Sequence, residues 1–179
     1  MRFEPTELQG VVLVKLEQHV DERGYFARSF CAAEFAAEGL ANHFPQSSLS
    51  FNKVAGTLRG MHYQLAPHAE TKLVRCSRGA ILDVVVDLRP SSKSYLRWQS
   101  FELNHLNGHA LYIPDGFAHG FQTLADNCEV SYSITPAFVS GAGAGLRWDD
   151  PAIDIRWPRP ISRISEKDRS WPLLGKASS

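Results

Sequence analysis

Two side chains capable of proton chemistry lie ten residues apart in LRGMHYQLAPHAETKLVRC, residues 58–76. His62 stands in an apolar, strand-like run, and Lys72 opens a second such run. An imidazole exchanges protons near neutral pH, so it can act as a general base or a general acid. An ammonium group can hold negative charge that develops on an oxygen atom. Taken singly, however, such a histidine is most often a packed residue, and such a lysine is most often solvated.

A second histidine, His119, lies in GHALYIPDGFAHGFQTL, residues 108–124. The order Gly108, Pro114, Gly116, His119 resembles the second sequence motif of the cupin superfamily, whose fold is a double-stranded β-helix or jelly roll. Proline and glycine at these positions favour a tight turn. We expect the chain to re-enter a strand after this turn, with His119 facing the interior of the barrel.

Metal-binding cupins supply a His-x-His pair and an acidic residue from their first motif, and this chain does not. His62 is followed by Tyr-Gln, and His68 lies too far along the loop to complete the pair. A first-row metal site usually needs three or four protein ligands, so His62 and His119 alone are too few. We therefore expect no metal. A metal-dependent cupin oxygenase or isomerase, with His68 and Glu70 as further ligands, is kept as an alternative.

Without a metal, His62 is free to act as an acid–base group. Arg59 and Lys72 would add positive charge near it. Tyr132, in the strand-like run EVSYSIT, is a candidate proton donor, and Asp168 is a candidate to orient and polarise a histidine. A basic histidine that faces a phenol, with cations nearby, suits proton abstraction next to a carbonyl group. Each of these side chains, taken alone, also fits a purely structural role.

Short strand-like runs, separated by Gly, Pro, Asn and Asp, must position these side chains. The runs are GVVLVKLEQHV, LVRC, AILDVVVDLR, ALYIP, GFQTL and VSYSIT. The sequence predicts one helix at CAAEFAAE, with Ser29 as its N-cap and Gly39 at the C′ position, and a short helical turn in ISRISEKD. The pattern as a whole predicts an all-β sandwich or barrel with a few short peripheral helices.

The composition limits the class of protein. The 179 residues suit one domain, which we place at residues 1–175, with 176–179 as a disordered tail. The 19 basic residues balance the 19 acidic ones, which argues against nucleic acid but allows a small anionic ligand. The sequence contains no apolar run near the roughly 20 residues of a membrane span and no signal-peptide core. Three cysteines without a CxxC pair favour reduced thiols, so we expect a cytoplasmic protein.

Longer stretches of the chain together resemble the dTDP-4-dehydrorhamnose 3,5-epimerase family, a group of cupin-fold nucleotide-sugar epimerases. The matching phrases are DERGYFARSF (21–30), GTLRGMHYQ (56–64), KLVRCSRGAILDVVVDLR (72–89), IPDGFAHGFQTL (113–124), the tyrosine strand (130–135), WDDP (148–151) and SEKD (165–168). LRGxHYQ followed by PxGFAHGF at this separation is highly specific. The resemblance implies a cupin-type jelly roll, a homodimer, a nucleotide-sugar substrate, no metal and no redox cofactor.

The resemblance also implies catalytic roles. His62 would be the general base, held by Asp168 in a dyad, and Tyr132 would be the acid on the opposite face of the sugar. Lys72 would stabilise the enolate. The substrate would be a 4-keto-6-deoxy sugar linked to a nucleoside diphosphate, because its ketone acidifies the hydrogens on C3 and C5. One cycle of abstraction and return inverts one carbon, and two cycles invert both.

Further residues are implied to bind the substrate. Arg59 and His119 would line the sugar and phosphate site, and Gln46 would face the nucleotide. Arg23 and Phe26, in the RGxF phrase, would approach the nucleotide from the partner subunit of the dimer. A non-catalytic sugar-nucleotide-binding cupin is a second alternative, which the set of acid, base and ammonium groups argues against, because binding alone needs no acid–base pair.

The chain departs from the family pattern in the nucleotide half of the expected site. Arg28 stands where the family usually has glutamate, and Ser48 stands where it usually has asparagine. The segment SGAGAG, residues 140–145, has no carboxylate where the family has an acidic position. Replacing an anion by a cation changes both charge and hydrogen-bond sense. We therefore expect altered nucleotide or sugar specificity, with CDP- and GDP-linked sugars among the candidates.

Overall fold

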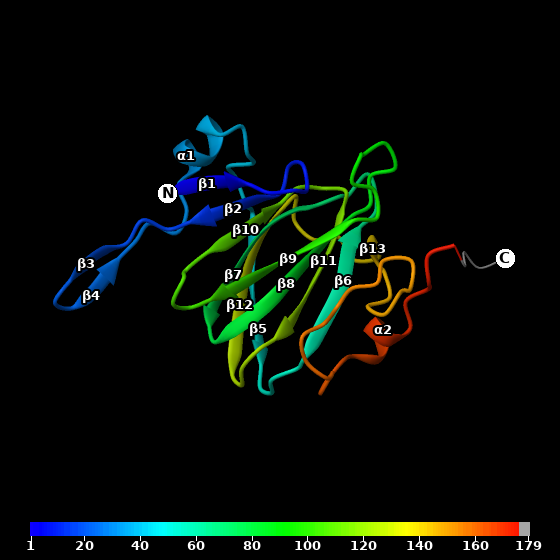
Figure 1. Cartoon of the computed structure of the whole chain (residues 1–179). Coiled ribbons are helices and arrows are strands. Elements are labelled where there is room, and N and C mark those ends of the chain that lie inside the picture. The colour runs from blue at the N-terminus through cyan, green and yellow to red at the C-terminus, as the bar shows by residue number, and fades with distance from the viewer. Residues whose placement is uncertain (176–179) are drawn as a thin grey trace.

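A computed structural model describes residues 1–175 as two antiparallel sheets with a hydrophobic core between them (Figure 1). The six-stranded sheet has the order β1 (Arg2–Pro5), β2 (Val12–Lys15), β10 (Ala110–Ile113), β7 (Thr71–Arg78), β12 (Cys128–Thr135) and β5 (Gln46–Asn52). The five-stranded sheet has the order β13 (Gly143–Gly145), β6 (Leu58–Gln64), β11 (Phe117–Thr123), β8 (Ala80–Asp87) and β9 (Trp98–Asn104). This architecture confirms the predicted all-β, cupin-type jelly roll. The expected tail, residues 176–179, lies outside the described residues.

The environment of strand β8 explains why its sequence is mostly apolar and does not alternate between apolar and polar residues. Val85 packs into the core between the two sheets, whereas Val84 and Val86 pack under the C-terminal segment, residues 146–175. Both faces of the strand are therefore covered, and both select β-branched apolar side chains. The C-terminal segment thus covers the outer face of the five-stranded sheet, and its residues 166–169 lie beside β6.

The helices are short and peripheral, as expected. Helix α1 (Ala32–Ala37) buries Phe35 on the outer face of the six-stranded sheet and ends before Gly39, whose φ of +71° suits the C′ position. The predicted N-cap Ser29 was wrong. The N-cap is Cys31, without a side-chain hydrogen bond, because the chain is still extended there and the Ser29 carbonyl accepts from Arg75 Nη2 at 3.1 Å. Helix α2 (Glu166–Arg169) forms within the predicted helical turn.

A two-stranded hairpin, β3 (His19–Asp21) and β4 (Gly24–Phe26), projects away from the two sheets (Figure 1). All six strand residues are exposed. Val20 and its cross-strand partner Tyr25 present apolar surface to solvent on one side of the hairpin, and Phe26 does so on the other. An isolated two-stranded hairpin has little stability of its own in water. The hairpin is therefore suited to packing against another surface.

The remaining sequence expectations concern thiols and membranes. Cys76 and Cys128 are fully buried, Cys31 is half-buried, and all three are free thiols. Burial raises the pKa of the Cys76 thiol to about 12, so it stays protonated at neutral pH. Across residues 1–175, neither helix has the length and apolar character that a membrane crossing requires.

Candidate active site

One cavity of about 590 Å³ opens between the two sheets and brings most of the candidate side chains together. This volume is typical of small-molecule sites. Both sheets and α2 contribute to its walls. The predicted site residues that line it are Gln46, Arg59, His62, Lys72, His119, Tyr132 and Asp168.

His62 and Asp168 form a hydrogen-bonded pair on one wall. His62 Nε2 lies 2.6 Å from Asp168 Oδ1, and the main-chain N–H of Gly60 donates to Asp168 Oδ2 at 3.5 Å. Burial opposes ionisation of this carboxyl group, but the hydrogen bonds from His62, Ser165 and Gly60 outweigh it and lower the pKa of Asp168. An ionised Asp168 accepts the Nε2 hydrogen and leaves Nδ1 as the basic nitrogen of the ring.

The C-terminal segment carries Asp168 to this wall. Leu58 N donates to the carbonyl of Arg163 at 2.8 Å, and Thr57 forms a parallel bridge with Arg163, so the segment docks along the start of β6. Ser165 then caps α2 by accepting from Asp168 N at 3.0 Å. Asp168 is consequently buried, with 4% of the residue exposed, although the sequence around it reads as a surface turn.

Lys72 is buried at 8% exposure and has two protein acceptors. Its Nζ lies 3.0 Å from Glu70 Oε1 and donates to the main-chain carbonyl of His62 at 3.2 Å. Glu70 precedes β7 by one residue, and its carboxylate turns towards the ammonium of Lys72 on that strand. The sequence analysis grouped Lys72 with His62, and in the structure the Lys72 ammonium contacts the main-chain carbonyl of His62.

Tyr132 stands on the opposite wall. It lies on β12 in the six-stranded sheet, where its neighbours across the ladder are Ser48 on β5 and Val74 on β7. His62 lies on β6 in the five-stranded sheet. The imidazole and the phenol thus enter one cavity from opposing sheets, as an acid and a base on two faces of a ligand require.

His119 enters the cavity from β11, directly across the ladder from His62. Its Nε2 lies 2.8 Å from Oδ2 of Asp83, which is fully buried. Sequence reasoning missed Asp83, although a lone carboxylate inside the apolar run AILDVVV is a recognisable signal, because buried charges need a partner. Gly116, with a φ of +83°, makes the turn that was predicted between β10 and β11.

Trp171 is a further cavity residue that the sequence did not reveal. Its ring lies edge-on to the His62 ring, with centroids 6.4 Å apart, and Lys167 Nζ lies 5.3 Å from its centroid. The indole packs directly on Gly145 of β13, where a Cβ atom would come within 2.3 Å of it. The absence of a side chain at Gly145 therefore admits the tryptophan to the wall beside the dyad.

The predicted binding residues divide into two groups. Arg59 Nε donates to Asn52 Oδ1 at 2.7 Å, and Gln46 Oε1 accepts from the main-chain N–H of Phe138 at 3.0 Å, both at the cavity. Arg23 and Phe26 lie on the projecting hairpin, outside the cavity lining of this chain. Their contact with a nucleotide in a partner subunit stays a prediction.

The departures from the family pattern divide in the same way. Ser48, Gly143 and Ala144 line the cavity. Arg28 lies outside it and pairs with Glu34, with Nη1 and Oε1 2.9 Å apart. The cavity therefore contains two of the three departures.

The donor set does not favour the metal-dependent alternative. Within residues 1–175, no group of three or more His, Cys, Asp and Glu side chains could hold a metal ion. Gln64, at the position of the missing second histidine, donates to Glu70 Oε2 at 2.8 Å. Glu70, named as a ligand for that alternative, is paired with Lys72.

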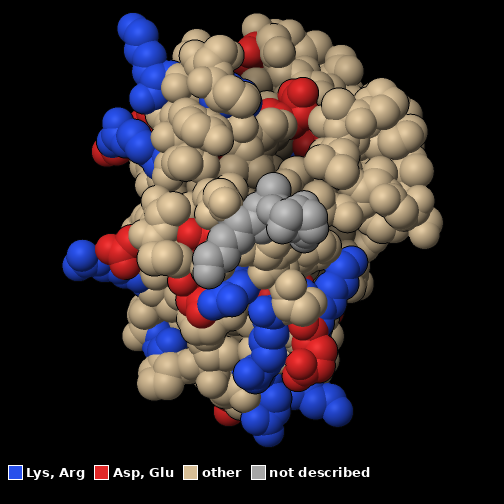
Figure 2. All heavy atoms as spheres, turned by 90° about the vertical axis from the view of Figure 1, so that its right-hand side faces the viewer, with Lys and Arg blue, Asp and Glu red and all other residues tan. Residues whose placement is uncertain are grey.

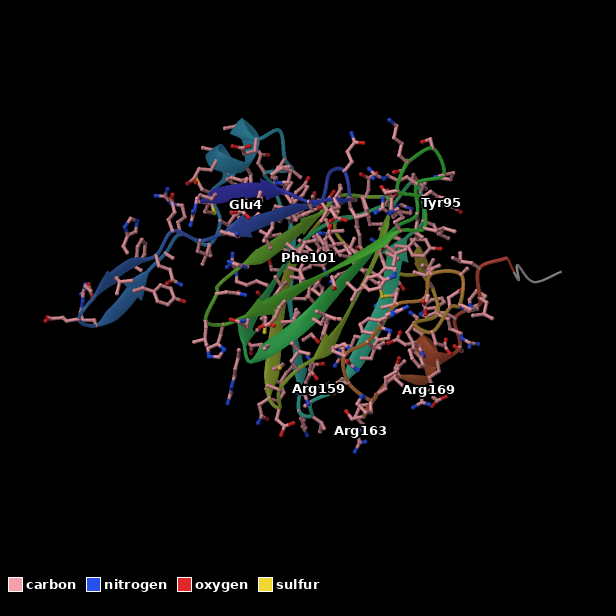
Figure 3. All side chains as sticks on the ribbon, viewed as in Figure 1. Glu4, Tyr95, Phe101, Arg159, Arg163 and Arg169 are labelled. Carbon is pink, nitrogen blue, oxygen red and sulfur yellow. The ribbon has the colours of Figure 1, made fainter. Side chains whose placement is uncertain are left out.

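Positive charge gathers on the face that carries α2. Figure 2 shows Lys and Arg spheres clustered over the lower half of this face, with a few Asp and Glu spheres among them, and Figure 3 places Arg159, Arg163 and Arg169 at the same end of the molecule. These arginines are exposed, as is Lys167, which also lines the cavity. Clustered positive charge raises the local concentration of an anionic ligand.

Comparison with known proteins gives a consistent result. A family model described as dTDP-4-dehydrorhamnose 3,5-epimerase matches residues 5–176. The proteins of that name from Sinorhizobium fredii and Methanothermobacter thermautotrophicus are 42% and 43% identical to this chain. Each match spans 97% of this chain, and the two matches span 90% and 94% of those relatives, respectively. The crystal structure of dTDP-4-dehydrorhamnose 3,5-epimerase from Bacillus anthracis with TDP and PPi bound has a TM-score of 0.94 at 35% identity, covering 97% of this chain and 99% of its own.

Proposed function

The chain belongs to the dTDP-4-dehydrorhamnose 3,5-epimerase family, and from that premise we propose how its own residues carry out an epimerisation. The protein is an isomerase that epimerises a 4-keto-6-deoxy sugar linked to a nucleoside diphosphate, at C3, at C5 or at both. His62, Asp168, Lys72 and Tyr132 carry the chemistry in this proposal.

The first step removes a proton from a carbon next to the C4 ketone. Nδ1 of His62 takes the proton, the C–H electron pair forms a C=C bond, and the carbonyl oxygen becomes an enolate. Asp168 stabilises the imidazolium that results, and the ammonium of Lys72 stabilises the negative oxygen. Fixed donors of this kind cost no reorganisation when the charge develops, so they lower the barrier to enolate formation.

The second step returns a proton to the other face of the same carbon. Tyr132 donates its phenolic proton, the C=C electron pair forms the new C–H bond, and the ketone is restored. The phenolate then regains a proton as the imidazolium loses one, through exchange with water. The overall reaction inverts one carbon and consumes no cofactor.

A single observation carries this assignment. A histidine with an ionised carboxylate partner and a tyrosine enter one cavity from opposing sheets. Two proton-transfer groups on opposite walls suit inversion, whereas a non-catalytic binding module has no need of them. Lys72 Nζ donates to the main-chain carbonyl of His62, so the ammonium group lies beside the His62–Asp168 dyad. This proximity supports a shared role in forming the enolate.

Substrate binding is assigned to the rest of the cavity. Arg59 and His119 bind the sugar and diphosphate, Gln46 faces the nucleotide, and Arg23 and Phe26 reach the nucleotide of a partner subunit in a homodimer. The exposed apolar hairpin supports such an exchange between subunits. Residues 1–175 act as one catalytic domain in the cytoplasm, and Ser48 together with residues 140–145 alters the preference for the nucleotide or sugar.

Proton NMR in heavy water with candidate 4-keto nucleotide sugars tests the function. The wild-type protein is expected to wash deuterium into C3, C5 or both and to produce the inverted sugar. His62→Ala is expected to abolish the exchange, whereas Glu102→Ala, at an exposed site on β9, retains it. Absence of exchange in the wild-type protein with every candidate would contradict the proposal.

A further inference from the structure

We propose that Glu70 is a positioning residue that directs one N–H of Lys72 into the cavity, where the enolate oxygen forms. This inference rests on the proposed epimerase function and adds to it a residue that has no proton-transfer role. It concerns the way in which a flexible lysine becomes a fixed donor.

The ammonium group of Lys72 has three N–H bonds in a tetrahedral arrangement. Two of its acceptors are fixed protein atoms: Glu70 Oε1 at 3.0 Å and the carbonyl oxygen of His62 at 3.2 Å. With two directions occupied, the third N–H direction is determined. Since Lys72 lines the cavity, this third N–H is the one left for a ligand.

The carboxylate of Glu70 is itself held in place. Gln64 Nε2 donates to Glu70 Oε2 at 2.8 Å, and Gln64 Oε1 accepts from the main-chain N–H of Val139 at 3.0 Å. The bond to Val139 fixes which end of the Gln64 amide faces Glu70. Position 70 therefore meets two donors, Gln64 on one side and Lys72 on the other, and its carboxylate offers one oxygen to each.

Burial restricts the movement of the Glu70, Lys72 and Gln64 side chains. The side chains of Glu70 and Lys72 are 9% and 10% exposed, and Gln64 is 5% exposed. Water is a poor substitute for a lost partner at such sites, so removing one acceptor leaves a donor unsatisfied or lets the ammonium turn. The segment that carries Val139 borders the cavity through Phe138, so the same chain of bonds ties the cavity rim to Lys72.

A structural ion pair and a positioning device predict different consequences. If Glu70 only balances the charge of Lys72, any substitution that keeps the negative charge preserves the enzyme. If Glu70 positions Lys72, an acceptor at the right place matters more than the charge. Aspartate keeps the charge and withdraws both acceptors by one methylene. Glutamine removes the charge; its single amide oxygen can still face Lys72, but the bond with Gln64 is lost because two NH2 groups would then meet.

The experiment compares Glu70→Asp and Glu70→Gln with the wild-type enzyme and with the control Glu7→Asp, at an exposed site outside the cavity. We expect Glu70→Asp to lower kcat about tenfold, with KM changed less than about twofold, because a misdirected donor stabilises the enolate poorly. Glu70→Gln is expected to stay within about threefold of wild-type kcat, because the acceptor for Lys72 remains, and to have a lower thermal midpoint, because the bond with Gln64 is lost. Thermal midpoints measured on the same samples separate loss of fold from loss of positioning.

Dependence on Lys72 gives the second readout. In a Lys72→Met background, Glu70→Asp is expected to reduce deuterium wash-in no further, because residues that act through one another are not additive. Wild-type kcat in Glu70→Asp, or a Glu70→Gln variant as impaired as Glu70→Asp, would overturn the inference while wild-type exchange leaves the epimerase function intact. Absence of exchange in the wild-type enzyme would instead reject the function itself.

Discussion

His62 Nε2 and Asp168 Oδ1 lie 2.6 Å apart, although 106 residues separate them along the chain. The contact exists because the C-terminal segment docks on the start of β6 through Leu58 and Arg163 and turns Asp168 inward at α2. The carboxylate is thereby withdrawn from water, while the imidazole keeps a side-chain exposure of 42% towards the cavity. The general base is thus accessible, and the group that orients it is protected.

The first prediction concerns this pair. Asp168→Asn is expected to lower kcat about a hundredfold or more, because an amide neither stabilises the imidazolium nor fixes the tautomer that leaves Nδ1 basic. Steady-state kinetics at saturating substrate measures this effect. Glu166→Gln, in the same helix with a 95% exposed side chain, serves as the control. Equal activity of Asp168→Asn and wild type would show that the dyad has no part in proton transfer.

The second prediction separates the two proton-transfer groups. Tyr132→Phe removes the acid and leaves His62 in place, so deuterium wash-in at the substrate carbon is expected to continue. The rate of inversion is expected to fall about a hundredfold, within the range for losing a general acid. One NMR time course in heavy water records both quantities. Exchange and inversion that fall together would show that Tyr132 does more than return the proton.

The third prediction concerns the packing of Trp171 on Gly145. Gly145→Ala places a Cβ atom within 2.3 Å of the indole ring, so the tryptophan must move away from residue 145. Overpacking of this kind costs about 1–3 kcal/mol, measurable by denaturant unfolding. The double variant Gly145→Ala/Trp171→Ala is expected to regain part of that stability, because the clash is gone. A stable single variant with unchanged tryptophan fluorescence would contradict the contact.

The fourth prediction concerns pH and Asp87, a fully buried carboxylate away from the cavity. Burial alone would raise the pKa of Asp87, but hydrogen bonds from Arg89, Ser92 and Ser94 outweigh it and hold the pKa well below its usual value. A depressed folded-state pKa contributes stability above the unfolded-state value, and this contribution is lost as pH falls through the folded-state pKa.

Asp87→Asn is therefore expected to cost about 3–5 kcal/mol at neutral pH, because Arg89 loses its buried partner. The stability difference between variant and wild type is expected to shrink as pH falls below about 4, where the unfolded-state carboxyl becomes protonated. Chemical unfolding between neutral and acidic pH measures both effects. A pH-independent difference would show that the charge of Asp87 is not what stabilises the fold.

The fifth prediction concerns the nucleotide. Ser48 and the carboxylate-free segment 140–145 stand where the family pattern has asparagine and an acidic residue, and cavity residues occur at both places. We therefore expect calorimetric titration with a panel of nucleoside diphosphates to show CDP or GDP binding at least as tightly as dTDP. Ser48→Asn is expected to shift the preference towards dTDP. A clear wild-type preference for dTDP would count against altered specificity.

Much of the fold follows from local sequence. Alternation and β-branched runs specify the strands, and Pro114 with Gly116 specifies the turn before His119, because these signals depend on a few neighbouring residues. The predicted N-cap of α1 was wrong because a contact with a residue distant in sequence overrides the local signal. Ser29 has the right side chain, but extended backbone and a contact with Arg75, a residue distant in sequence, keep the helix from starting there.

By itself, the sequence determined the jelly roll, the family and the chemical types in the site: imidazole, phenol, ammonium and carboxylate. Only the tertiary structure decided how these groups are partnered. Asp83 with His119 and Trp171 on Gly145 are contacts between residues that lie far apart in the sequence. The physical reason is that strand periodicity fixes the face on which a side chain lies, whereas the packing of two sheets and a docked C-terminal segment fixes which side chains meet there.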